Sequence, residues 1–138
     1  MTRDAENGHA HCLICGTCNP DSLGLRFRDV DANTVCARFQ AHPGLQGYDG
    51  ILHGGVTSAL LDAAMTHCLF HRGVQAVTGD LYVRFMEPIP CHLALDVRGW
   101  IVSDTPPLYQ LKAQLVHDGR VMAWAQAKFV ERGWSLDA

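Results

Sequence analysis

The chain has 138 residues, of which 48% are hydrophobic and 18% are charged, and its formal net charge is −3. This length predicts one domain, and the composition is typical of an ordered globular protein rather than a disordered one. The weak negative charge excludes the basic surface on which broad nucleic-acid binding depends, so we expect no nucleic-acid partner.

The N-terminal residues, MTRDAENGHAHC, contain no apolar stretch of the length that a signal peptide needs. No run in the chain approaches the roughly 18 apolar residues of a membrane helix, so we expect no membrane partner. Six cysteines without an export signal are expected to be reduced thiols or metal ligands rather than disulfides. We therefore predict a cytoplasmic location.

Five features are predicted in the first part of the chain: a Cys- and His-rich segment, a strand, a turn, a second strand and a loop. Apolar side chains alternate in the first strand at Leu23, Leu25 and Phe27, and the loop holds three glycines and a proline. The Cys- and His-rich segment covers residues 1–22, the first strand 22–30, the turn 30–33, the second strand 34–40 and the loop 41–50.

The most apolar stretch predicts one long helix at residues 56–72. Gly54 and Gly55 precede this helix, and Gly73 fits the position after its last turn. Apolar side chains cover nearly its whole circumference, so we expect the helix to be buried on most sides.

Four further strands follow the helix, and Asp118-Gly119 between the last two is a strong hairpin signal. Small side chains at Ala123, Ala125 and Ala127 suit close packing against another surface. The four strands are expected within residues 76–88, 92–102, 108–116 and 121–130. This order of elements predicts an α+β fold in which a curved antiparallel sheet wraps around one long central helix.

The only charged side chain between Asp49 and Arg72 is that of Asp62, in the middle of the predicted helix. Its neighbours three and four residues away are Ser58, Ala59, Met65 and Thr66, most of which are small and leave room for a ligand or another chain. A desolvated carboxylate beside a cavity is a candidate general base or nucleophile. The structural alternative is that Asp62 bonds to an amide or hydroxyl in the core.

The two glycines before the helix leave amide N–H groups uncovered where the helix dipole is positive. Such groups could hold the oxyanion that forms when a carbonyl is attacked. Asp62 lies two turns further along, so one molecule could use both sites only awkwardly. A dimer could bring the carboxylate of one chain to the glycines of the other.

The stretch "GILHGG" followed by "LLD" resembles the hot-dog fold thioesterases of the PaaI-like group, which carry His-Gly-Gly at the start of the central helix and an acidic residue nine positions after the His. His53 and Asp62 have this spacing. "VRFMEPIP" is similar to the strand after the helix in that family, and "CLICGTCNPDSLGLRF" to the opening of one subgroup. By this resemblance, residues 23–138 form a hot-dog domain behind the N-terminal segment.

The resemblance further implies a homodimer or homotetramer that hydrolyses an acyl-CoA thioester and needs no cofactor for catalysis. Asp62 would be the general base or nucleophile, and the amide of Gly54, alone or together with that of Gly55, would polarise the thioester carbonyl. His53 would shape the turn or bond the loop backbone, and Thr78 would orient the water.

Several relatives carry Asn or Gln six residues before the motif His, where this chain has Gly47, so Gln46 is the expected substitute. The remaining predicted substrate contacts lie along the helix and on the strand after it, at Met65, Thr66, Leu69 and Phe85. They would line a pocket for a medium acyl chain or an aromatic ring.

A second constellation precedes the domain, where His9, Cys12, Cys15 and Cys18 follow one another at intervals of three. "CLICG" resembles a zinc knuckle, in which Cys-x-x-Cys-Gly turns both thiolates toward one metal. These four residues are therefore predicted ligands of a structural zinc ion. The alternative is a tail with free thiols or with cysteines packed against the sheet.

Two other functions stay open at this point. A hot-dog dehydratase or hydratase would pair a loop His with the helix carboxylate, and "HPG" at His42 superficially resembles such a loop, although His42 lies twenty residues before Asp62. A module that binds acyl-CoA without turning it over is the non-enzymatic alternative.

Overall fold

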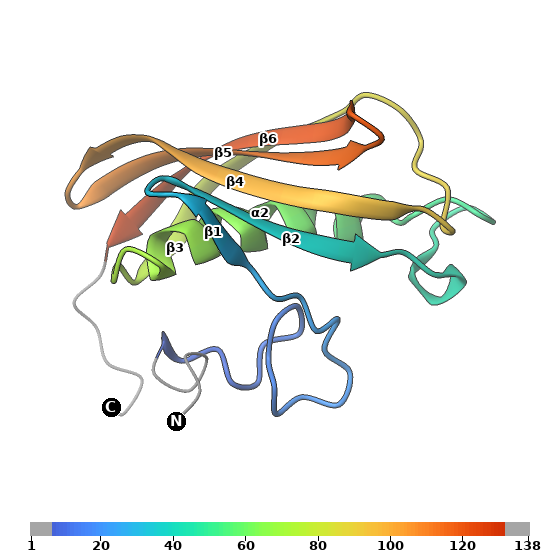
Figure 1. Ribbon diagram of the computed structural model, residues 1–138, viewed down its shortest axis with the longest axis horizontal. Helices are drawn as coiled ribbons and strands as arrows, with labels where there is room; N and C mark the ends of the chain where they lie inside the picture. Colours follow the sequence, from blue (N-terminus) through green and yellow to red (C-terminus); the bar gives the residue numbers. More distant parts are fainter. Residues whose placement is uncertain (1–6, 132–138) are drawn as a thin grey trace.

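The computed structural model describes residues 7–131, which form one curved sheet of six antiparallel strands around a single long helix (Figure 1). The spatial order of the strands is β1-β2-β4-β5-β6-β3, so β1 and β3 are the two edges. The elements are β1 (Arg28–Asp31), β2 (Thr34–Gln40), the 3₁₀ helix η1 (Pro43–Leu45), α2 (Gly54–Phe70), β3 (Ala76–Phe85), β4 (Ala94–Thr105), β5 (Leu108–His117) and β6 (Arg120–Glu131). This architecture confirms the predicted fold class.

The hairpin predicted between the last two strands is present. Asp118 and Gly119 have φ values of 48° and 77°, and a positive φ at both central residues is what a two-residue type I′ turn requires. Ala123 and Ala125 on β6 are fully buried, and Ala127 is nearly so, which agrees with their predicted close packing.

The first strand differs from its prediction, because β1 begins only at Arg28. The alternating residues before it bond to the N-terminal segment instead: Leu23 N–H donates to Leu13 O at 2.8 Å and Leu25 N–H donates to Ile14 O at 3.0 Å. Alternation correctly indicated buried or half-buried side chains at these positions, but it did not identify the hydrogen-bond partners of their backbone.

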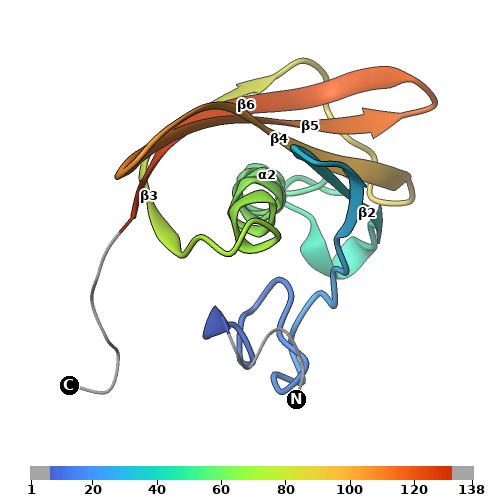
Figure 2. The same ribbon diagram turned by 60° about the vertical axis from the view of Figure 1, so that its left-hand side comes forward.

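Helix α2 lies inside the concave side of the sheet, and the described part of the N-terminal segment lies on its other side (Figure 2). The helix begins two residues earlier than predicted, because His53 serves as its N-cap, and Gly73 (φ 75°) follows its end. Gly99 of β4 marks the closest approach of helix and sheet, since a Cβ there would lie 2.7 Å from the carbonyl oxygen of Ala64. This approach explains the small residues along that face of the helix.

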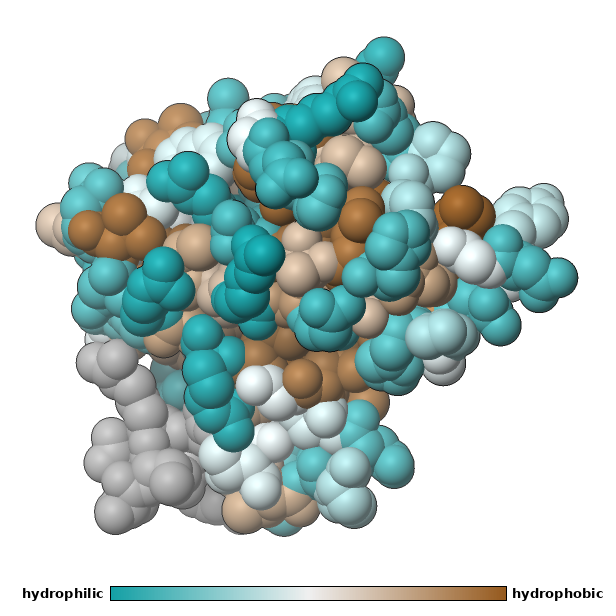
Figure 3. Space-filling view, turned by 45° about the vertical axis from the view of Figure 1, so that its right-hand side comes forward, coloured by the Kyte–Doolittle hydropathy of each residue, from teal (hydrophilic) through white to brown (hydrophobic). Residues whose placement is uncertain are grey.

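Large hydrophobic side chains remain exposed along edge strand β3 and just after it. Leu81 is 38% exposed, Tyr82 50%, Phe85 53% and Met86 51%. The end of the molecule that carries residues 41–53 likewise shows hydrophobic side chains between hydrophilic ones (Figure 3). A long edge strand with such side chains is a template for pairing with another chain.

No helix within residues 7–131 has both the length and the hydropathy that crossing a bilayer requires. The predicted boundary at residue 22 stays a prediction.

Candidate functional site

Asp62 lies at the centre of α2, and its side chain is neither sealed in the core nor fully exposed. Its Oδ1 accepts a hydrogen bond of 2.6 Å from the hydroxyl of Thr78 on β3. Burial raises the pKa of this carboxyl above its ordinary value, while the bond from Thr78 and the nearby charge of His9 act in the opposite direction. A carboxylate whose pKa is raised by desolvation, and which is partly exposed, is suited to accept a proton from water.

Thr78 reaches Asp62 from the edge strand, next to an irregularity in the pairing of β3 with β6. Thr78 is opposite Phe129 and Asp80 is opposite Lys128, so Gly79 is an extra residue. A bulge of this kind bends the strand and re-aims the side chains beside it. The Thr78 side chain is exposed, so the pair that it forms with Asp62 is open to solvent from the β3 side.

The His-Gly-Gly motif forms the start of α2. His53 has the extended backbone of an N-cap residue (φ −60°, ψ 133°), and its Nδ1 accepts the N–H of Gly55 at 2.8 Å. The His53 side chain therefore caps the first turn of the helix instead of bonding the loop backbone. Because Gly55 gives its N–H to this imidazole, its amide is engaged within the chain, which leaves Gly54 as the candidate for the predicted oxyanion role.

Gly54 occupies the first position of the helix and is exposed. Within residues 7–131, no acceptor receives its N–H. This amide points out of the helix N-terminus, where the macrodipole favours negative charge. Gly54 is therefore the candidate donor for an oxyanion.

Gly54 and Asp62 of one chain are eight residues apart on the same helix, which corresponds to a rise of about 12 Å. A reacting carbonyl must lie within about 3 Å of both an oxyanion donor and the attacking atom. The two groups of one chain are therefore poorly placed to act together on one carbonyl.

Two shallow hollows flank the start of α2. The first, of about 400 Å³, is lined by Gly47, Tyr48, Ile51, Leu52, His53 and Gly54. The second, of about 300 Å³, shares Ile51 and Leu52 with it and also includes Phe85. The Phe85 ring lies 3.5 Å from the position that a Cβ on Gly54 would take, so Phe85 stands beside the candidate oxyanion donor. Its predicted substrate role stays a prediction.

The other predicted substrate contacts are placed differently. Met65 is 0% exposed and Leu69 is 1% exposed, so both belong to the core rather than to an open pocket. Thr66 is half-buried, and its hydroxyl bonds to the backbone carbonyl of Asp62 at 3.0 Å. Gln46 uses its side-chain oxygen to accept the N–H of Gly50, so it stabilises the loop as the structure stands.

Sequence reasoning did not single out Tyr48, which is 88% exposed and lines the hollow beside Gly54. The sequence did offer a signal for Tyr48, because an aromatic residue between Gly47 and Asp49 in a Gly-rich loop is expected to be exposed.

The N-terminal cluster forms in part. His9, Cys12 and Cys15 bring their ligand atoms together, whereas the predicted fourth ligand, Cys18, lies outside that group. Its exposed thiol lies 3.8 Å from the hydroxyl of Thr17.

Replacing Thr78 by Val tests the bond to the carboxylate. A donor that favours the charged carboxylate lowers its pKa, so its loss should raise the pKa of Asp62 further. In a pH–rate profile, the acidic limb of kcat/KM should move to higher pH, and the rate at neutral pH should fall. The matched variant Thr105→Val, at the exposed end of β4, should leave the limb in place; an unmoved limb in Thr78→Val would contradict the assigned bond.

Comparisons with known proteins find similarity to thioesterases. Residues 49–103, which include both His53 and Asp62, match the model of the thioesterase superfamily. Acyl-coenzyme A thioesterase THEM4 of Bos taurus is 34% identical over 73 residues, which is 51% of this chain and only 30% of that relative's length.

Solved structures resemble the fold as a whole. Zebrafish thioesterase superfamily member 2 has a TM-score of 0.77 at 15% identity, over 96% of this chain and 99% of that one. A Streptococcus mutans protein solved with acetyl-CoA has a TM-score of 0.74 at 17% identity, over 79% and 89% of the two chains.

Proposed function

We propose that this chain, which has the hot-dog fold of the thioesterase superfamily, hydrolyses acyl-CoA thioesters to the free acid and CoA. The curated relative is an acyl-CoA thioesterase, and one structural neighbour holds acetyl-CoA. The matched segment also contains the start of α2 and its carboxylate. The observation that carries the proposal is the half-buried, solvent-reachable Asp62 bonded to Thr78.

In the proposed reaction, Asp62 takes a proton from a water molecule as that water attacks the thioester carbonyl. The carbonyl oxygen gains negative charge in the tetrahedral intermediate, and an amide N–H stabilises it. The C–S bond then breaks, and the proton held by Asp62 passes to the departing thiolate of CoA. Direct attack by the carboxylate, followed by hydrolysis of the anhydride, uses the same two groups.

We place the oxyanion donor on a second copy of the chain, because about 12 Å separates Gly54 from Asp62 within one helix. Edge strand β3 carries Thr78 and the exposed Leu81, Tyr82 and Phe85, so pairing of two β3 strands would cover this surface next to Asp62. In an isologous dimer, each carboxylate would then face Gly54 of the partner subunit. A homodimer is the smallest assembly that completes the site, and a homotetramer would contain two such pairs.

One structural detail bears on the dehydratase alternative. His42, the loop histidine considered for a dehydratase, accepts the N–H of Gly44 at 3.2 Å as the N-cap of η1. It is thus engaged in its own loop. The binding-module alternative predicts the same fold and the same affinity for CoA but no dependence of turnover on Asp62.

The experiment is a panel of acyl-CoA thioesters, from acetyl to medium-chain and aromatic acyl groups, assayed for release of free thiol. We expect turnover that is highest for one class of acyl group, alongside no hydration of an enoyl-CoA. Tight binding of every thioester without thiol release would contradict the proposal and favour the binding module.

A further inference from the structure

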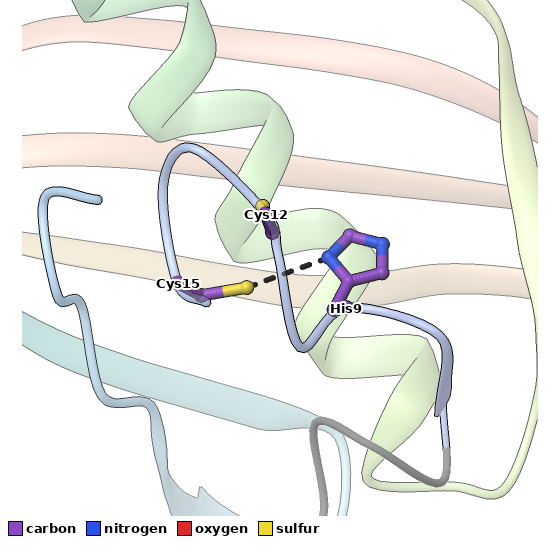
Figure 4. Close-up of side chains that lie close together, drawn as sticks. All are labelled: His9, Cys12 and Cys15. Atoms are coloured by element: carbon purple, nitrogen blue, oxygen red, sulfur yellow. Dashed lines mark hydrogen bonds between the residues drawn. The ribbon is translucent and has the colours of Figure 1, made fainter. Parts of the chain in front are cut away.

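We propose that His9, Cys12 and Cys15 form a binding site for one divalent transition-metal ion, with Zn²⁺ as the expected occupant. The ligand atoms of these residues all lie within 4.8 Å of one another. Figure 4 shows their side chains converging, with His9 Nδ1 3.4 Å from Cys15 Sγ. Tetrahedral Zn–S and Zn–N bonds of ordinary length place sulfur and nitrogen about 3.6 Å apart, so the observed separation suits a shared ion.

The loop that carries the three residues is already held in the required shape. The N–H of Ile14 donates to Cys12 Sγ at 3.3 Å, and the N–H of Gly16 donates to Cys12 O at 2.9 Å. A Cβ on Gly16 would lie 2.4 Å from the nitrogen of Cys12, so only glycine fits there. The N–H of Cys18 closes the turn on Ala10 O at 2.8 Å. These contacts pre-organise the Cys-x-x-Cys-Gly turn around its two sulfur atoms.

The cluster is also anchored against the domain. Cys15 is 1% exposed, and its carbonyl accepts a bond of 2.7 Å from Arg26. The ring of His9 packs edge-on against Phe70 of α2, with the ring centroids 4.8 Å apart. An ion here would fix the N-terminal segment over the last turns of the helix, so its role is structural.

The donor set selects the kind of ion. Two thiolates and an imidazole are soft or borderline ligands that favour Zn²⁺ over Mg²⁺ or Ca²⁺. Binding forms two metal–sulfur bonds and one metal–nitrogen bond and displaces the protons of the two thiols, so two protons leave for each ion bound. The fourth tetrahedral position is left to water or another small ligand, because Cys18 lies outside the group.

The test begins with elemental analysis of the full chain purified without chelator. We expect about one zinc ion per chain in the unmodified protein and in Cys18→Ser, and a loss of at least tenfold in occupancy in Cys12→Ser and His9→Ala. Equal zinc in all four proteins, zinc in none of them, or loss of zinc in Cys18→Ser would each overturn the site as assigned.

Cobalt replacement gives a second readout. It depends neither on enzymatic activity nor on how much zinc the protein retains during purification. Co²⁺ added to the chelator-treated chain should produce the sulfur-to-cobalt charge-transfer band and strong visible bands of a tetrahedral site. Measured per bound cobalt ion, the charge-transfer intensity should be about half as large in Cys12→Ser, which keeps one of the two thiolates. Absence of the charge-transfer band in the unmodified chain would contradict the proposal.

Thiol counting separates this site from a disulfide between the same cysteines. Under denaturing, non-reducing conditions with chelator, all six cysteines should react as free thiols. A disulfide between Cys12 and Cys15 would instead leave four reactive thiols in the unmodified chain and all five in Cys12→Ser. That result would overturn the metal site. Because none of these measurements involves thioesters, their outcome is independent of the proposed hydrolysis.

Discussion

Replacing Asp62 by Asn is expected to lower kcat for acyl-CoA hydrolysis by about 10²- to 10⁴-fold, because the amide cannot accept the proton of the attacking water. The amide oxygen can still accept the Thr78 hydroxyl, so the geometry around position 62 is retained. KM should change little. Steady-state thiol release with the best acyl-CoA measures both parameters.

The matched control is Asp96→Asn, which removes an exposed carboxylate on β4 that pairs with Arg38. Its kcat should equal that of the unmodified chain. Equal rates in Asp62→Asn and Asp96→Asn would remove Asp62 from the mechanism.

Stability should respond to the same substitution in a pH-dependent way. Burial raises the folded-state pKa of Asp62 above its ordinary value of 3.8, so the folded chain favours the protonated form. The stability that protonated Asp62 contributes to the folded state is fully present below the unfolded-state pKa. It is lost as pH rises through the folded-state pKa. Asp62→Asn should therefore unfold at a higher temperature than the parent at neutral pH, and this difference should shrink toward acidic pH.

Replacing Gly54 by Pro is expected to lower kcat by about 10²- to 10³-fold, because it deletes one oxyanion N–H. The first helical position tolerates proline, whose missing N–H has no partner inside the helix. The preceding residue, His53, already has the extended backbone that proline requires before it. The helix should be retained, which circular dichroism and the melting temperature check.

Gly54→Ala provides the control, since alanine keeps the N–H and adds a methyl group at an ordinary contact distance of 3.5 Å from Phe85. It should keep most of the activity. Equal losses in Gly54→Ala and Gly54→Pro would mean that bulk, rather than the lost donor, causes the defect.

Local patterns determined much of this fold in advance. Period-two alternation and turn residues located five of the six strands, and the Asp118-Gly119 hairpin followed from its turn chemistry alone. Leu23 and Leu25 were misjudged because alternation reports half-burial and not the bonding partner. Here that partner is the N-terminal segment.

The site was only partly accessible to such reasoning. A lone carboxylate in an apolar helix identified Asp62 without any structure, and the glycines identified the helix start. The sequence did not show whether Met65 and Leu69 face the core or an open pocket. A helix that is apolar all round gives no signal of which face meets the sheet. The contact between Thr78 and Asp62 joins residues sixteen apart on two elements, so no local pattern reveals it. The family resemblance pointed to Thr78 only as a residue that orients the water.

The claim that two chains share each site is tested most directly by a heterodimer. One chain would carry Asp62→Asn and the other Gly54→Pro, with different affinity tags so that the mixed species is isolated. If the carboxylate of one subunit works with the amide of the other, one of the two sites is intact, and the heterodimer should recover about half of the parent activity. Activity no higher than that of the two inactive homodimers would contradict the shared site.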